Sequence, residues 1–212
     1  MKKTLLTTML AALLVLPLGG VAMAQTPEAA PLELPAQEML FVHGEVPAQT
    51  AAPDSITPAI HGIVLAMLHQ EQTEFQISDP VVGWEALYNM LSLYGEMDDR
   101  ANIAEESLLL PAETVMDFSS ALTSDLSELG ELPEELSDRI VYDAENSGFL
   151  LTCGSDSLAR VDVTSVQNEE DRLILDGALV YLVDGSDLAA FRAILAPCDN
   201  LFGYTIVTLE LV

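Results

Sequence analysis

Basic residues are scarce in this chain, which has two lysines and five arginines against 34 acidic residues. Both lysines lie within the first three positions, so the remainder carries five arginines, all 34 acids and a formal net charge of −29. Nucleic acids and anionic membrane surfaces bind proteins through lysine and arginine, so neither is an expected partner. One explanation of the acidity is attraction of cations or of a basic partner. The other is solubility in a salty environment, where salt screens the repulsion between charges more than about 8 Å apart.

Recognisable catalytic motifs are also missing. The sequence contains no G-x-S-x-G nucleophile elbow, no C-x-x-C pair and no glycine-rich phosphate loop. One tryptophan and 6% aromatic residues offer few surfaces on which sugars could stack. Paired carboxylates can hydrolyse glycosides, but a chain with 34 acidic residues offers so many pairs that none of them indicates a glycosidase. A non-catalytic protein is therefore expected, with a hydrolase that uses an unrecognised site as an alternative.

The N-terminus has the three parts of a bacterial secretory signal peptide. Two lysines precede an apolar run, 5–18, and Ala22-Met23-Ala24 forms an A-x-A cleavage site. The run is shorter than the roughly 20 residues that a membrane span needs. Residues 1–24 are thus predicted to be a signal peptide, cleaved before Gln25. The mature chain is expected in the periplasm or outside the cell, without a membrane span.

Composition divides the remainder of the chain. Residues 25–56 are rich in proline, alanine and acids, which is typical of an extended leader, and the apolar patch Met39–Val42 could form an edge strand. Apolar residues recur with helical spacing over 57–138 and alternate as in strands over 139–212. We expect an α+β fold in which about four helices precede a C-terminal antiparallel β-sheet.

Proline, glycine and capping residues set the expected helix boundaries. The helices are expected to begin at Thr57 as the N-cap of Pro58, at Ser78 or Asp79, at Asp98 or Asp99, and at Pro111, and the last three to end at Gly95, Leu110 and Leu129. The expected strands are 140–142, 149–151, 158–166, 173–175, 178–183 and 204–212, with 187–195 as a short helix. The first two strands flank a turn and predict a hairpin.

Two of the three histidines, His61 and His69, lie in the first expected helix. Positions eight apart on a helix differ by about 80° around the axis and about 12 Å along it. They cannot bind one metal ion together, whereas helical histidine pairs that do so are four apart. Both are expected on a packing helix, and a site completed by acids from elsewhere stays an alternative.

The stretch DAENSG has part of the pattern of a calcium loop. Asp143, Glu145, Ser147 and Gly148 match ligand positions 1, 3 and 5 and the turn glycine at 6. Position 12, where a bidentate glutamate belongs, is Gly154. A polar hairpin turn explains the same residues and is favoured. The favoured expectation is therefore that the protein has no cofactor, and Ca²⁺ is the alternative. The acidic turn 184–187 allows the same two interpretations.

Cys153 and Cys198 are the two cysteines of the chain. An even number of cysteines in an exported protein predicts a disulfide between them. On the chain-entropy estimate such a bond stabilises the fold by about 4 kcal/mol. A catalytic cysteine is the alternative, which would leave the other thiol unpaired.

Aromatic and apolar residues form a stripe around Trp84, Leu87 and Gly95. With this spacing the stretch WEALYNMLSLYGEMDDRANIAEESLLLP resembles a single tetratricopeptide repeat, and the resemblance implies a helical pair that binds a peptide or protein. Tyr88 and Arg100 depart from the family pattern, and no second copy follows at the repeat spacing. A helical hairpin in the core explains the same stripe and is favoured.

These observations lead to three hypotheses about function. The favoured one is an exported, non-catalytic interaction or structural module that contacts another protein of the bacterial envelope. The alternatives are a calcium-binding module that uses the acidic turns and a hydrolase with an unrecognised site.

Overall fold

A computed structural model of the chain describes residues 53–104, 107–154 and 158–212, all within the unit Glu45–Val212. The predicted signal peptide, the leader before Pro53 and the patch Met39–Val42 lie outside the described residues.

The described residues form three α-helices, and two of them have a proline at the first or second position. The helices are α1 (Thr57–His69), α2 (Pro80–Tyr94) and α3 (Ala112–Ser119), with short 3₁₀ turns at Asp54–Ile56, Gly95–Met97, Leu126–Leu129 and Glu134–Leu136. The Asp79 carboxylate caps α2 because it accepts hydrogen bonds from the amides of Val81 and Val82. The N-cap of α1 is Ile56, which has no capping side chain, so the capping role predicted for Thr57 is wrong.

The strands form two antiparallel sheets of four. The first contains β1 (Asn102–Ala104), β2 (Ser107–Pro111), β3 (Ile140–Asp143) and β4 (Gly148–Thr152), in the order β1-β2-β4-β3. The second is the meander β5 (Ala159–Glu169), β6 (Arg172–Tyr181), β7 (Asp187–Pro197) and β8 (Tyr204–Leu211). The α+β class is confirmed, but the described residues have two sheets, where one C-terminal sheet was expected.

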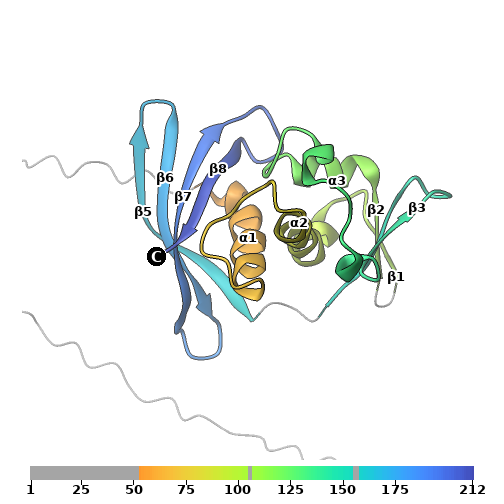
Figure 1. The fold of residues 1–212 in the computed structure, drawn as a ribbon, viewed down its shortest axis with the longest axis horizontal. Helices are drawn as coiled ribbons and strands as arrows, with labels where there is room; N and C mark the ends of the chain where they lie inside the picture. The colour runs from red at the N-terminus through yellow and green to blue at the C-terminus, as the bar shows by residue number, and fades with distance from the viewer. Residues whose placement is uncertain (1–52, 105–106, 155–157) are drawn as a thin grey trace, which may run out of the picture. The chain divides into compact units, whose positions relative to one another are not determined.

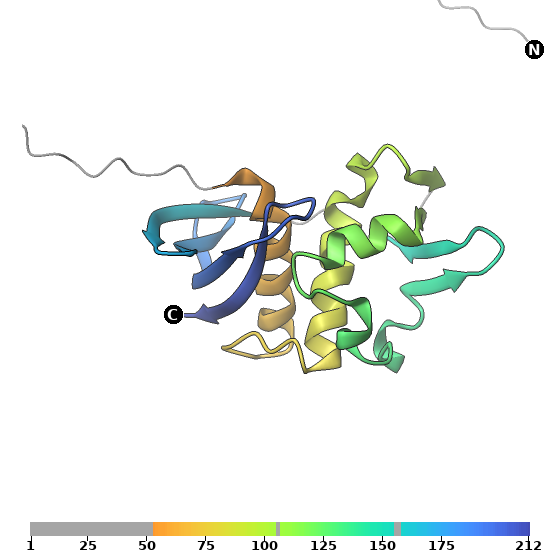
Figure 2. The same ribbon diagram turned by 90° about the horizontal axis from the view of Figure 1, so that it is seen from above.

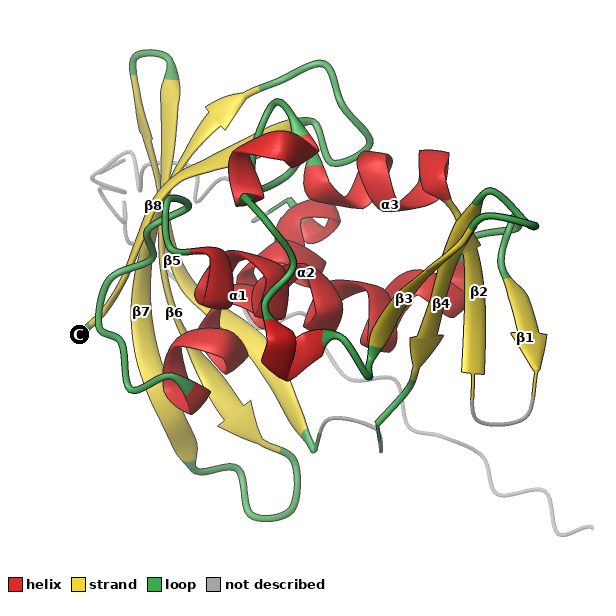
Figure 3. Ribbon diagram, turned by 45° about the vertical axis from the view of Figure 1, so that its right-hand side comes forward, coloured by secondary structure: helices red, strands yellow, loops and turns green. Residues whose placement is uncertain are grey.

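Helices α1 and α2 lie between the two sheets (Figures 1 and 3). Helix α1 contacts β5, β7 and β8, whereas α2 contacts α3 and β4. The view from above shows the same succession of layers (Figure 2). Apolar side chains from both sheets and all three helices join in one buried cluster. This shared core fixes the helix ends and loops on which the candidate sites are built.

The helix expected over 98–110 is wrong, because this segment forms β1 and β2. Leu108 and Leu110 are buried and alternate with half-buried neighbours, as in a strand that packs one face on a core. They pair with Leu151 and Phe149 of β4. Since α2 is followed by strands, the helical pair implied by the tetratricopeptide resemblance is not formed.

The helix expected over 111–129 ends at Ser119 and gives way to a loop and a 3₁₀ turn. The Ala121 carbonyl accepts a hydrogen bond from the amide of Ile206 in β8, at 2.8 Å. This link to the sheet replaces the helical hydrogen bond that the same carbonyl would accept in a longer α3.

The segment 187–195 is strand β7, so the short helix expected there is also wrong. Phe191, Ala193 and Leu195 are buried at alternate positions. Phe191 stands opposite Gly177 of β6, where a Cβ would lie 2.6 Å from the phenyl Cζ. The glycine thus leaves the room that the ring occupies.

Candidate functional site

The two histidines of α1 face different partners. Nδ1 of His61 lies 2.7 Å from the Tyr94 hydroxyl. Burial lowers the pKa of His61 from 6.5 to about 4 and raises the pKa of Tyr94. His61 is therefore neutral near pH 7 and joins α1 to α2 inside the core.

His69 belongs to a second polar contact between these helices. Its Nδ1 lies 2.5 Å from Oε1 of Glu85, and the amide of Gln70 donates to Oε2 at 2.7 Å. The Glu85 side chain is 7% exposed and the His69 side chain 66% exposed. His69 and Gln70 thus hold the buried carboxylate of Glu85 in place. Sequence reasoning missed this role of Glu85 because it depends on the register of two helices.

The residues of the calcium hypothesis lie on the β3–β4 turn, where the hairpin prediction is confirmed. The Asp143 carboxylate accepts hydrogen bonds from the backbone amides of Glu145 and Asn146 and from the Asn146 side chain. These bonds lower its pKa, the Asn146 side-chain bond most strongly. Ser147 has a positive φ of 49° and ends the turn. Across the described residues no group of three or more histidine, cysteine or acidic side chains is placed to hold a metal ion, and the calcium hypothesis stays a prediction.

The two cysteines carry free thiols in the structure, so the predicted disulfide is not formed. Cys153 follows β4 and is half-buried, whereas Cys198 follows β7 and is exposed. The two strands belong to different sheets, and this separation is the physical reason that the thiols do not meet. Burial raises the pKa of the Cys153 thiol, which disfavours a thiolate nucleophile.

The strongest candidate site is a cleft that we call the Arg100 cleft, about 390 Å³ in volume. It is lined by Pro58, Tyr94, Met97, Asp98, Asp99, Arg100, Phe118 and Leu201. Met97 is 67% exposed and Leu201 59% exposed, although both are large apolar side chains. Water-exposed apolar groups grouped around a cleft are typical of binding surfaces.

Four parts of the chain build this cleft. Pro58 lies in the first turn of α1, Tyr94 ends α2, and the 3₁₀ turn after α2 presents Met97. Phe118 lies on α3, where its ring packs edge-on against Phe202 of the β7–β8 turn at 5.7 Å between centroids. The same turn is held by the Asn200 amide, which donates to the Ser120 carbonyl at 2.9 Å. The apolar walls are therefore fixed by tertiary contacts.

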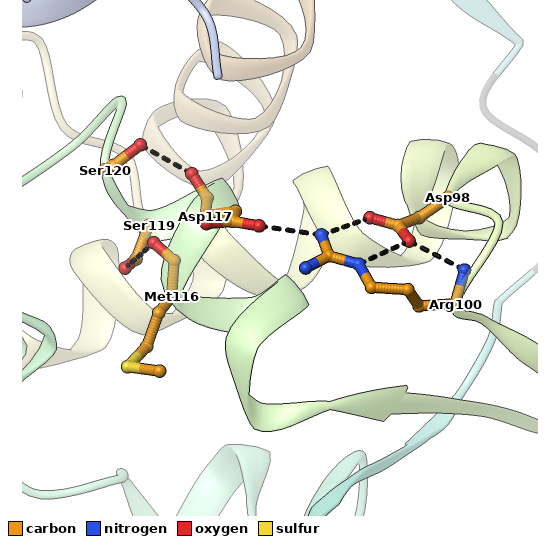
Figure 4. A network of polar contacts seen from close by, with 6 residues as sticks. All are labelled: Asp98, Arg100, Met116, Asp117, Ser119 and Ser120. Atoms are coloured by element: carbon orange, nitrogen blue, oxygen red, sulfur yellow. Dashed lines mark hydrogen bonds and ion pairs between the residues drawn. The ribbon is translucent and has the colours of Figure 1, made fainter. Parts of the chain in front are cut away.

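One side of the cleft is an ion-pair network around Arg100 (Figure 4). The guanidinium donates to both oxygens of Asp98, at 2.9 and 2.7 Å, and to Asp117 at 2.7 Å. Hydrogen bonds from Arg100 lower the pKa of Asp98, and those to Asp98 and Asp117 raise the pKa of Arg100. Asp99 also lines the cleft, so with Asp98 it leaves the rim with more acidic than basic side chains.

Sequence reasoning missed the Arg100 cleft. The one available signal was the triplet Asp98-Asp99-Arg100, because arginine is rare in this chain. Its pairing with Asp117 and its closeness to Leu201 depend on the fold.

Comparison with known proteins does not name a function. The chain matches no protein-family model, no curated protein and no solved structure. Among the described residues no helix is long and apolar enough to cross a membrane.

Proposed function

We propose that this protein is an exported, non-catalytic binding protein that docks a partner protein of the bacterial envelope in the Arg100 cleft. The partner segment presents an apolar side chain next to a lysine or arginine. The apolar group contacts Met97, Phe118 and Leu201, and the basic group pairs with Asp99 at the rim.

The observation that carries this proposal is the combination of exposed apolar walls and a negative rim. The Arg100 charge is matched twice over, by Asp98 and Asp117, so the cleft repels an anionic ligand. A basic partner also gains from the charge of −29 on the chain after residue 24, because long-range attraction speeds encounter.

The lining of the cleft supports binding over catalysis. It contains no histidine, cysteine or serine, and its arginine is held in ion pairs by two aspartates. Of its two carboxylates, Asp98 is held in an ion pair by Arg100, which lowers its pKa and disfavours its use as a general acid.

Site-specific photo-crosslinking in the producing bacterium tests the docking surface. A benzoylphenylalanine at position 97 should give a discrete adduct with one envelope protein. The matched control is position 183, because Val183 is 70% exposed but lies in the turn after β6. In the same experiment Asp99→Lys should remove the adduct, since it places a cation where the partner's basic group binds.

Three outcomes would contradict the proposal. They are no adduct from position 97, equal adducts from positions 97 and 183, or an adduct that Asp99→Lys leaves unchanged. Export has a separate readout, because the protein purified from the periplasm should begin at Gln25 by mass spectrometry. A cytoplasmic protein that retains residue 1 would refute that part alone.

A further inference from the structure

A second pocket, which we call the Arg139 pocket, lies between the helices and the end of β4. Its volume is about 430 Å³, within the range of small-molecule sites. It is lined by Leu65, Tyr88, Asn89, Ser92, Leu93, Arg139, Thr152, Cys153 and Gly154. It shares no lining residue with the Arg100 cleft, so the two sites are independent of each other.

The arginine of this pocket differs from most arginines of the chain. Arg100, Arg160 and Arg192 each form an ion pair with an aspartate. Among the described residues Arg139 has no such ion pair, and its guanidinium lies over the ring of Tyr88, 5.6 Å from the centroid. A cation held on an aromatic face keeps its N–H donors free for an anion.

Tyr88 and the backbone hold this arginine in place. Tyr88 is 6% exposed, and its hydroxyl donates to the Thr152 carbonyl at 2.8 Å. The Thr152 amide in turn donates to the Arg139 carbonyl at 3.0 Å. The side chain therefore stands on a rigid platform that joins α2 to β4, which lowers the entropy lost on binding.

The remaining lining gives the pocket both polar and apolar character. Ser92 and Asn89 offer hydrogen-bonding groups from α2, and Leu65 and Leu93 supply apolar surface. Cys153 carries a thiol whose pKa is raised by burial and by the charge of Glu96, although a hydrogen bond with Ser92 opposes this. The thiol stays protonated near pH 7 and forms part of the wall.

We propose that the Arg139 pocket binds a carboxylate that carries a short apolar chain. The guanidinium of Arg139 pairs with the carboxylate, and Leu65 and Leu93 contact the chain. Arginine matches the two oxygens of a carboxylate in a bidentate arrangement, which favours this anion over a spherical one. Two sources share this chemistry, namely a free aliphatic acid and the C-terminal carboxylate of a peptide.

Titration of the mature protein with sodium hexanoate, followed by ¹H–¹⁵N NMR, tests the site. Amide signals of residues 88–93 and 152–154 should shift, whereas hexan-1-ol, which has the same chain without the charge, should bind about tenfold or more weakly. Arg139→Gln should weaken hexanoate binding by about the same factor. Arg172→Gln, at an exposed arginine of β6, is the matched control and should leave it unchanged.

The comparison of acid with alcohol needs no variant, so it decides the proposal even if Arg139→Gln fails to fold. Equal binding of hexanoate and hexan-1-ol, no binding of hexanoate, or shifts confined to other surfaces would overturn it. Acetyl-leucyl-leucine and its amide distinguish the sources. Tighter binding of the free dipeptide acid than of hexanoate identifies a peptide C-terminus, and the reverse identifies an aliphatic acid.

Discussion

The imidazole of His61 and the phenol of Tyr94 are joined at 2.7 Å, which links the middle of α1 to the end of α2. Their rings also pack edge to face, with centroids 5.9 Å apart. His61 is 3% exposed, so the contact lies in the core, while Tyr94 forms a wall of the Arg100 cleft. One side chain pair thus connects the helix packing to the candidate site.

This relationship predicts a loss of stability in mild acid. The pKa of His61 is about 4 in the folded chain, whereas an unperturbed histidine, as in the unfolded state, has a pKa of 6.5. As the pH falls, the unfolded state therefore binds a proton before the folded state does. The free energy of unfolding is therefore highest above about pH 6.5. It decreases as the pH drops toward 4, by no more than about 2–3 kcal/mol. Urea unfolding at about pH 7 and pH 5 measures the change.

Variants separate this effect from other titrations. His61→Leu should flatten the pH dependence over that interval. Asp98 and Asp143, whose pKa values are lowered in the fold, contribute stability that is lost only below about pH 4. An unchanged slope in His61→Leu would show that another group is responsible.

Glu85 should matter for stability far more than an exposed glutamate. Glu85→Ala removes the acceptor of the hydrogen bonds from His69 and Gln70, and we expect a loss of about 2 kcal/mol in the free energy of unfolding. Glu113→Ala, at an exposed position, should change it by less than about 0.5 kcal/mol. Equal effects in chemical denaturation would contradict the buried role of Glu85.

Helices α1 and α2 approach closely at Gly62. A Cβ at this position would lie 2.6 Å from the Ala86 carbonyl oxygen and 2.6 Å from Cγ of Met90. Since a backbone carbonyl cannot move aside alone, Gly62→Ala should cost about 1–3 kcal/mol despite the better helix propensity of alanine. Gly154→Ala, where no atom lies within 4 Å, is the control that thermal unfolding should find nearly unchanged.

Calcium should not stabilise the protein more than magnesium does. Both Asp143 oxygens already accept hydrogen bonds within the β3–β4 turn. Thermal unfolding in CaCl₂, MgCl₂ and NaCl at matched ionic strength should give equal midpoints. A rise specific to calcium that Asp143→Ala abolishes would instead support the calcium module, because a ligand of the native state stabilises it by mass action.

Local chemistry was enough to predict several elements. Pro80 after the capping Asp79 predicted the start of α2, and the turn around Ser147 predicted the β3–β4 hairpin. The long alternating run near Val166 predicted β5. In each case the decisive signal lies within a few residues, because capping, turn formation and strand alternation are local.

Longer-range pairing overrode local propensity elsewhere. The leucines of β2 suit a helix as well as a strand, and β4 decided between them by pairing Leu108 with Leu151. The alanines of β7 likewise favour a helix, but Phe191 fits over Gly177 of the neighbouring strand. Such fits join residues that are distant in the chain, so no periodicity reveals them.

By itself, the sequence determined the strong negative charge, the α+β class and the main helix starts, since these depend on composition and short-range contacts. Only the tertiary structure decided where an arginine meets its partner. Asp117 of α3 reaches Arg100 beside Leu201, and Tyr88 of α2 supports Arg139. The core that packs both sheets on the helices brings these side chains together, because burying apolar faces fixes the geometry of the polar groups at their edges.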